Sequence, residues 1–210
     1  MSINLSKGSK INLNKAIEES GLIGLPGIPG GSVGLNNVMV GLGWDPVKTN
    51  RLFSVSKAVD CDAFCITLHN GKVISNDDLI YFGHKTNAAH TIAHMGDNLT
   101  GEGEGDDEQI RMLLNMVDRS VDSIVIGVNI FSGKQRGQNF DRIQNAFVRI
   151  ADIDHNFEIC RYNLTSELRG CKDVSMVFGV LVREGNAWHF NAMPQPVAAD
   201  SIEAVARRFK

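Results

Sequence analysis

The feature that most constrains the fold of this chain is a series of short segments rich in β-branched and aromatic residues, separated by polar turns. These segments occupy residues 38–42, 63–68, 123–131, 145–150, 157–162, 175–183 and 187–192. Each is long enough for one strand and too short for an amphipathic helix. We therefore predict a mainly β protein, a β-sandwich of two antiparallel sheets with a few short helices.

The two ends of the chain add further elements. Residues 176–183 and 188–192 are predicted to pair as a hairpin around a turn at 184–187. Helix is predicted over 202–209 and around 118–122, where Asp118 is suited to cap the first turn. Near the N-terminus, even spacing predicts strands on both sides of a turn at residues 7–10, formed by Ile3, Leu5, Ile11 and Leu13.

The composition is close to that of an average soluble globular protein, and we expect the chain to be cytoplasmic. The 210 residues suit one domain, and 43% of them are hydrophobic. A net charge of -3 disfavours direct nucleic-acid binding, and we find neither a secretory leader nor a transmembrane segment. The cysteines form no C-x-x-C pair and are expected to remain thiols in the cytoplasm, namely Cys61, Cys65, Cys160 and Cys171.

Residues 96–108, GDNLTGEGEGDDE, hold six carboxylates, four glycines and no Lys or Arg. Carboxylates this close repel one another, and a solvated acidic loop would relieve that repulsion. The glycines permit positive φ, however, so the backbone is able to fold back and direct its oxygens inward. Calcium accepts about six to eight oxygen ligands in flexible geometry, whereas magnesium demands a tight octahedron. The segment therefore favours a calcium site.

A second pair of carboxylates, Asp60 and Asp62, opens the apolar run at residues 63–68. Residues two apart in a strand point to the same face, so both side chains are expected side by side at one end of a sheet. Alone, they are typical of solvated aspartates at a strand end. Beside the acidic segment, they are candidates for a second wall of the metal site.

Other metal and nucleotide sites fit less well. Asp97 and Glu108 have the spacing of the first and last positions of an EF-hand loop, but Glu102 stands where that loop needs glycine. His90 and His94 are four residues apart, a spacing that suits zinc on a helix, yet no further zinc motif accompanies them. A phosphate-binding loop of the G-x-x-x-x-G-K-[ST] type is absent from the sequence.

In order and approximate spacing, several segments resemble the successive signatures of the TerD family. They are VGLGWD at 40–45, DCDA at 60–63, HMGDNLTGEGEGDDE at 94–108, QNF at 138–140, NAFVR at 145–149 and MVFG at 176–179. The resemblance covers nearly the whole chain. It implies a single TerD-like domain over residues 1–210, with a Gly/Pro-rich loop insertion at about residues 21–34.

The resemblance further implies a β-sandwich that binds two calcium ions and has no established catalytic activity. Members of the family occur in operons linked to tellurite resistance, other chemical stress and phage defence. Trp44 and Asp45 would form a supporting wall of the site. The implied ligands are Asp60, Asp62, Asp97, Asn98, Gly101, Glu102, Gly103, Glu104, Asp106, Asp107 and Glu108.

We therefore expect a calcium-binding stress-response protein that acts as a binding module or scaffold without catalysis. Its partners are expected to be other proteins of a stress-response complex, including at the inner membrane surface. The alternative is a divalent-metal-dependent phosphoester hydrolase, whose carboxylates would hold magnesium or manganese beside the substrate. A third hypothesis, a structural shell or tail component, predicts that metal is irrelevant to fold and association.

Overall fold

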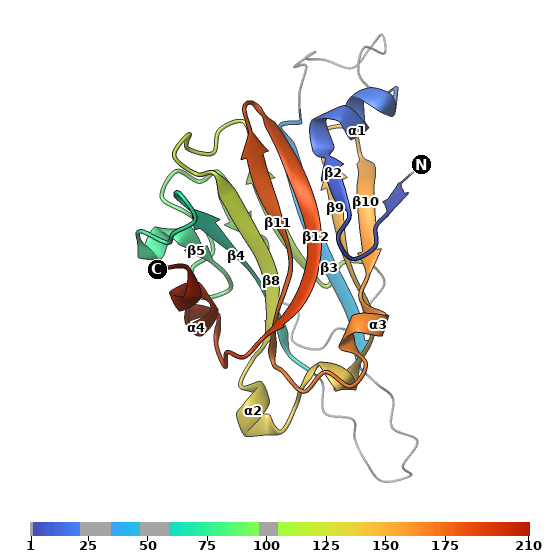
Figure 1. The fold of residues 1–210 in the computed structure, drawn as a ribbon, viewed down its shortest axis with the longest axis vertical. Coiled ribbons are helices and arrows are strands. Elements are labelled where there is room, and N and C mark those ends of the chain that lie inside the picture. Colours follow the sequence, from blue (N-terminus) through green and yellow to red (C-terminus); the bar gives the residue numbers. More distant parts are fainter. Residues whose placement is uncertain (1, 22–34, 47–58, 97–104) are drawn as a thin grey trace.

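The computed structural model describes residues 2–21, 35–46, 59–96 and 105–210, which form two six-stranded sheets packed face to face (Figure 1). Sheet A contains, in spatial order, β1 (Ile3–Asn4), β10 (Phe157–Asn163), β9 (Ile143–Asp152), β3 (Asn37–Pro46), β7 (Glu108–Leu113) and β6 (Ile92–His94). Sheet B contains β2 (Lys10–Asn12), β12 (Ala187–Val197), β11 (Ser175–Glu184), β8 (Ser123–Ile130), β4 (Cys61–Leu68) and β5 (Leu79–Ile80). The predicted mainly β sandwich is confirmed.

Neighbouring strands pair antiparallel throughout the described sheets, except that β1 pairs parallel with β10. The predicted hairpin is confirmed as β11 and β12, whose pairing runs to Glu184 opposite Ala187. The sequence did not predict β6 and β7, which complete one edge of sheet A. Most of the Gly/Pro-rich stretch, residues 22–34, lies outside the described residues.

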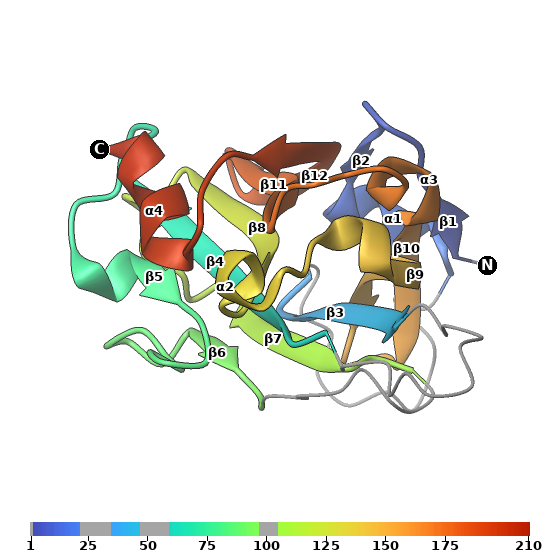
Figure 2. The same ribbon diagram turned by 90° about the horizontal axis from the view of Figure 1, so that it is seen from below.

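The two central strands of sheet B are buried along their whole length. All eight residues of β4 and all eight of β8 are buried, because sheet A covers one face and α4 (Ile202–Ala206) covers part of the other (Figure 2). On that outer face, Phe64 and Ile66 belong to the same apolar cluster as Val205. Strands covered on both faces lose the polar alternation of half-exposed strands, which explains why they appear as continuous apolar runs.

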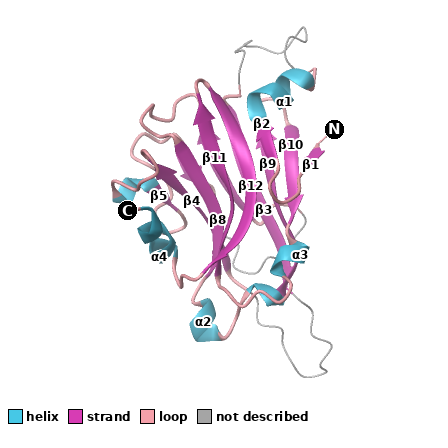
Figure 3. Cartoon of the chain, in the orientation of Figure 1, coloured by secondary structure: helices cyan, strands magenta, loops and turns pink. Residues whose placement is uncertain are grey.

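Helices are few and lie at the periphery of the sheets (Figure 3). Besides α1 (Leu13–Glu19) and α4, they are α2 (Gly133–Arg136), α3 (Thr165–Leu168) and the 3₁₀ turns η1 (Asn76–Asp78), η2 (Phe140–Arg142) and η3 (Arg207–Phe209). The longest in the described ranges, α1, has seven residues, so no helix there could cross a bilayer. The helix predicted over 202–209 is confirmed as α4 followed by η3.

Two local predictions were wrong. Leu13 does not continue a strand, because the side chain of Asn12 accepts a hydrogen bond from the Lys15 amide at 3.0 Å and starts α1 there. Leu13 and Ile17, one turn apart, are then both buried. No helix forms around 118–122 either. The Val121 amide donates to the carbonyl of Asp118 at 3.1 Å, which closes a single turn before β8.

Candidate functional site

Four of the predicted ligands converge at one end of the sandwich. Asp60 and Asp62 flank Cys61 at the start of β4, and Asp107 and Glu108 stand at the start of β7. Burial raises the pKa of the Cys61 thiol well above its usual value, and the charges of Glu108, Asp62, Asp60 and Asp107 raise it further. Carboxylates act on a thiol in this way only at short range. A hydrogen bond from the backbone of β4 to Glu108 brings the two acidic segments together, and we call the four carboxylates and this thiol the Cys61 cluster.

Glu108 occupies the space between the two sheets. It pairs with the buried Leu42 on β3, and its own side chain is fully buried on the same inner face. Its Oε2 accepts a hydrogen bond from the backbone amide of Ala63 in the opposite sheet and lies 3.4 Å from Nε2 of His94 on β6. A carboxylate this far from water requires such partners. No spacing in the sequence predicted His94 as one of them.

Trp44 connects β3 to both acidic segments. Its backbone amide donates to Oδ2 of Asp107 at 2.7 Å, and its indole Nε1 donates to the carbonyl of Val59 at 3.3 Å. This is the arrangement expected of a supporting wall. Asp45 is oriented differently, because its Oδ2 accepts from the amide group of Asn145 at 2.8 Å.

Asp106 does not join the other carboxylates. Arg149 donates to both of its oxygens, from Nε to Oδ1 at 2.6 Å and from Nη2 to Oδ2 at 2.7 Å. Gln109 adds a hydrogen bond to Oδ2 at 3.1 Å, and the Asp106 side chain is fully buried under these partners. The adjacent Asp107 and Glu108 accept instead from the backbone amides of Trp44 and Ala63.

Six of the predicted ligands lie outside the described residues, namely Asp97, Asn98, Gly101, Glu102, Gly103 and Glu104. Within the described ranges, no group of three or more His, Cys, Asp or Glu side chains is placed so that it could hold a metal ion. Asp60 also has a cationic neighbour, since Nη1 of Arg136 lies 3.2 Å from its Oδ2. The described part of the chain therefore supplies one acidic wall and its supports.

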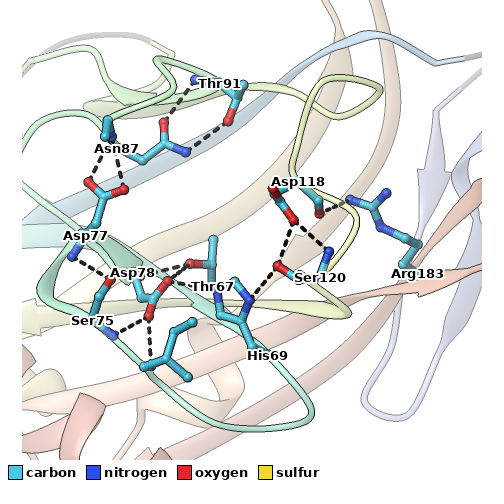
Figure 4. A network of polar contacts seen from close by, with 12 residues as sticks. Thr67, His69, Ser75, Asp77, Asp78, Asn87, Thr91, Asp118, Ser120 and Arg183 are labelled. Carbon is cyan, nitrogen blue, oxygen red and sulfur yellow. Dashed lines mark hydrogen bonds and ion pairs between the residues drawn. The ribbon is translucent and has the colours of Figure 1, made fainter.

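A second polar network lies at the opposite end of β4 and centres on the buried Asp78 (Figure 4). Its carboxylate accepts hydrogen bonds from the amides of Ile74 and Ser75, both at 2.8 Å, and from the hydroxyl of Thr67 at 2.9 Å. Nε2 of His69 lies 3.0 Å from Oδ1. Burial by itself raises the pKa of this carboxyl, but these hydrogen bonds outweigh it and hold the pKa below its usual value.

The other ring nitrogen of His69 lies 2.9 Å from the hydroxyl of Ser120, so a serine, a histidine and an aspartate stand in series (Figure 4). In a nucleophilic triad the histidine accepts the proton of the serine hydroxyl. Here the Ser120 hydroxyl donates to Oδ1 of Asp118 at 2.7 Å, and the same oxygen accepts from the Ser120 amide at 2.8 Å. These contacts are those of a turn that holds the ends of β4 and β8 together.

Comparison with known proteins agrees with the signatures in the sequence. A family model described as TerD domain matches residues 28–209. The chain is 37% identical to Stress response protein SCP2 of Bacillus subtilis (strain 168) in an alignment of 216 residues that covers 100% of both chains. It is 35% identical to Tellurium resistance protein TerD of Serratia marcescens over 208 residues, covering 99% of this chain and 97% of that protein.

A solved structure shares the fold. It is described as the crystal structure of a homologue of telluride resistance protein (TerD) from Streptomyces coelicolor A3(2). The alignment has a TM-score of 0.64 at 21% identity and covers 84% of this chain and 99% of the other. At this identity the likeness supports the β-sandwich alone.

Proposed function

Because the chain belongs to the TerD family, we propose that it is a calcium-binding protein of tellurite and chemical stress resistance and of phage defence. It acts as a cytoplasmic binding module or scaffold for other proteins of a stress-response complex, at or near the inner membrane surface, and without catalysis. Comparing the proteins retained from the native host in calcium and in chelator tests this role. Retention that does not depend on calcium would contradict it.

One observation carries the calcium proposal. Glu108 accepts a hydrogen bond from the backbone amide of Ala63, so the carboxylates at the start of β7 lie against the start of β4, which carries Asp60 and Asp62. The charges of all four also raise the pKa of the Cys61 thiol, so they repel one another as well. A divalent cation relieves that repulsion, and carboxylates are the ligands that calcium prefers. Asp106 is left out of the proposed ligands, since both of its oxygens bind Arg149. The implied second ion would depend on residues 97–104, outside the described residues.

The purified chain is expected to bind calcium more tightly than magnesium. A carboxylate-rich, glycine-rich segment suits the longer metal–oxygen distances and the higher coordination number of calcium. Magnesium retains its waters and demands an octahedral arrangement of ligands. Isothermal titration calorimetry with each ion, after removal of metal by chelator, measures both dissociation constants. Heat with magnesium alone, together with manganese-dependent phosphatase activity, would favour the hydrolase instead.

Replacing both Asp60 and Asp62 by Asn is expected to remove one bound calcium per chain. The amide oxygens are uncharged and weaker ligands, and the repulsion that a cation offsets is reduced at the same time. Calorimetric stoichiometry, checked by metal analysis after gel filtration, measures the loss. Asp45→Asn is the matched control, because Asp45 is half-buried and its carboxylate binds Asn145. Unchanged stoichiometry in the double variant would show that Asp60 and Asp62 are ordinary strand-end aspartates.

A further inference from the structure

The outer face of sheet A carries a row of three residues at the site where Asp106 lies. Gly41 on β3 pairs with Gln109 on β7 and with Arg149 on β9, so the three stand side by side across the sheet. The side chain of Leu42, the next residue, is buried in the core, which places Gly41 on the opposite face. The row therefore lies on the face of sheet A that points away from sheet B.

Asp106 lies directly on the glycine of this row. A Cβ atom on Gly41 would collide with the carboxyl carbon and both carboxyl oxygens of Asp106. Two residues along β3, a Cβ on Gly43 would collide with the ring of Phe147 and would stand 2.7 Å from the carbonyl oxygen of Gly105. The two glycines of the G-L-G sequence thus leave room for the end of the acidic segment on the backbone of β3.

Arg149 and Gln109 reach across from either side of Gly41 and bind the carboxylate between them. The pairing with Asp106 raises the pKa of the Arg149 guanidinium. Arg149 is itself held by Glu158, whose Oε2 lies 3.5 Å from its Nη1. A two-point contact between two fixed planar groups defines both distance and orientation, which a single hydrogen bond does not.

We propose that Asp106 and Arg149 are positioning residues that clamp the end of the acidic segment on β3 and thereby hold Asp107 and Glu108 toward Cys61. Asp106 is then an anchor of the site and not a calcium ligand. Three hydrogen bonds connect the clamped segment to the positions of Asp107 and Glu108. The Asp107 amide donates to the carbonyl of Leu42 at 2.7 Å, Trp44 donates to Asp107, and Ala63 donates to Glu108. The calcium part of this inference rests on the proposed function.

Arg149→Met is expected to weaken calcium binding about tenfold while leaving the number of bound ions unchanged, because residues that orient metal ligands commonly contribute about that much. Arg149→Lys keeps the charge without the two-point contact and should fall between Arg149→Met and the parent chain. Calorimetry gives affinity and stoichiometry together. Arg161→Met is the matched control, since Arg161 binds Glu158 at 2.8 Å on the neighbouring strand. A calcium affinity within about twofold of the parent for Arg149→Met would overturn the proposal.

Asp106→Asn separates an anchor from a ligand. If Asp106 is an anchor, Asp106→Asn should lose as much calcium affinity as Arg149→Met and should keep the full number of bound ions. The double variant should then bind calcium no more weakly than either single variant, because both substitutions remove the same interaction. If Asp106 is a calcium ligand, Asp106→Asn should lose a bound ion, and the double variant should lose further calcium affinity. That second result would contradict the inference. Should Arg149→Met fail to fold, Asp106→Asn and Arg149→Lys decide the question.

Hydrogen exchange measured in the absence of metal distinguishes this inference from the proposed function. In chelator, hydrogen exchange at the Asp107 amide should be faster in Arg149→Met than in the parent chain, because the clamp no longer holds that amide on the carbonyl of Leu42. The same amide in Arg161→Met should exchange as in the parent. Faster exchange in a chain that binds no calcium would confirm the clamp and refute the calcium site. Unchanged exchange would refute the clamp itself.

Discussion

Saturating calcium is expected to raise the melting temperature of this protein by about 5 to 11 °C for each occupied site. A ligand that binds only the folded chain at a hundred times its dissociation constant stabilises it by about 2.7 kcal/mol. For a chain of 210 residues, each kcal/mol corresponds to about 2 to 4 °C at the melting temperature. The gain arises because Asp60, Asp62, Asp107 and Glu108 are held close together only in the folded state.

Differential scanning calorimetry in calcium and in chelator measures this shift, with magnesium at the same concentration as the control. The Asp60→Asn, Asp62→Asn double variant should show a smaller rise. In chelator the chain is expected to remain folded, since one apolar cluster joins the inner faces of both sheets and does not depend on the acidic segment. No calcium-dependent shift would refute the proposed site. Loss of the far-ultraviolet circular dichroism signal in chelator would show that the core alone is insufficient.

Asp78→Ala is expected to destabilise the fold by about 3 kcal/mol, because it leaves several buried donors without their acceptor. The donors are the amides of Ile74 and Ser75, the hydroxyl of Thr67 and the ring of His69. The Asp78 side chain is only 7% exposed, so water replaces these contacts poorly. Chemical denaturation gives the free energy of unfolding, and the melting temperature should fall by about 6 to 12 °C.

Asp77→Ala is the matched control for this change. Asp77 is adjacent in η1, but its side chain is 43% exposed and accepts from the single amide of Ala88. We expect it to cost about 1 kcal/mol or less. Equal losses in the two variants would show that the buried network around Asp78 contributes nothing beyond a surface turn.

The stabilisation by Asp78 should depend on pH with a definite sign. Its folded pKa lies below the usual 3.8, so the folded state favours the ionised form. The contribution is complete above the unfolded pKa and is lost as the pH falls from there through the folded pKa. The difference in unfolding free energy between the parent chain and Asp78→Ala should therefore shrink below about pH 4. A difference that stays constant down to pH 3 would contradict this account.

The β-sandwich was predictable because strands are enriched in β-branched and aromatic residues, and this enrichment is visible segment by segment in the sequence. The segments that became β4, β8, β11 and β12 were visible as β-branched runs bounded by turns. The strand β7 was missed because its first residue, Glu108, is the end of an acidic segment. A carboxylate at the start of a strand ordinarily indicates a solvated edge, and only the packing of sheet B against it turns Glu108 inward.

The acidic segment and the Asp60–Asp62 pair were also visible in the sequence, since carboxylate clusters are a matter of composition. Their proximity was predicted when Asp60 and Asp62 were placed as a second wall of the site. The position of Cys61 between the two segments and the separate contacts of Asp106 were not predicted. Alternation along a strand determines which residues share a face, but not what lies over that face. β3 is paired between β7 and β9, and this places Arg149, 43 residues along the chain, over the oxygens of Asp106. The sequence by itself thus determined the fold class and the two clusters of carboxylates. The pairing of distant strands decided which carboxylates lie against the start of β4 and which one binds Arg149.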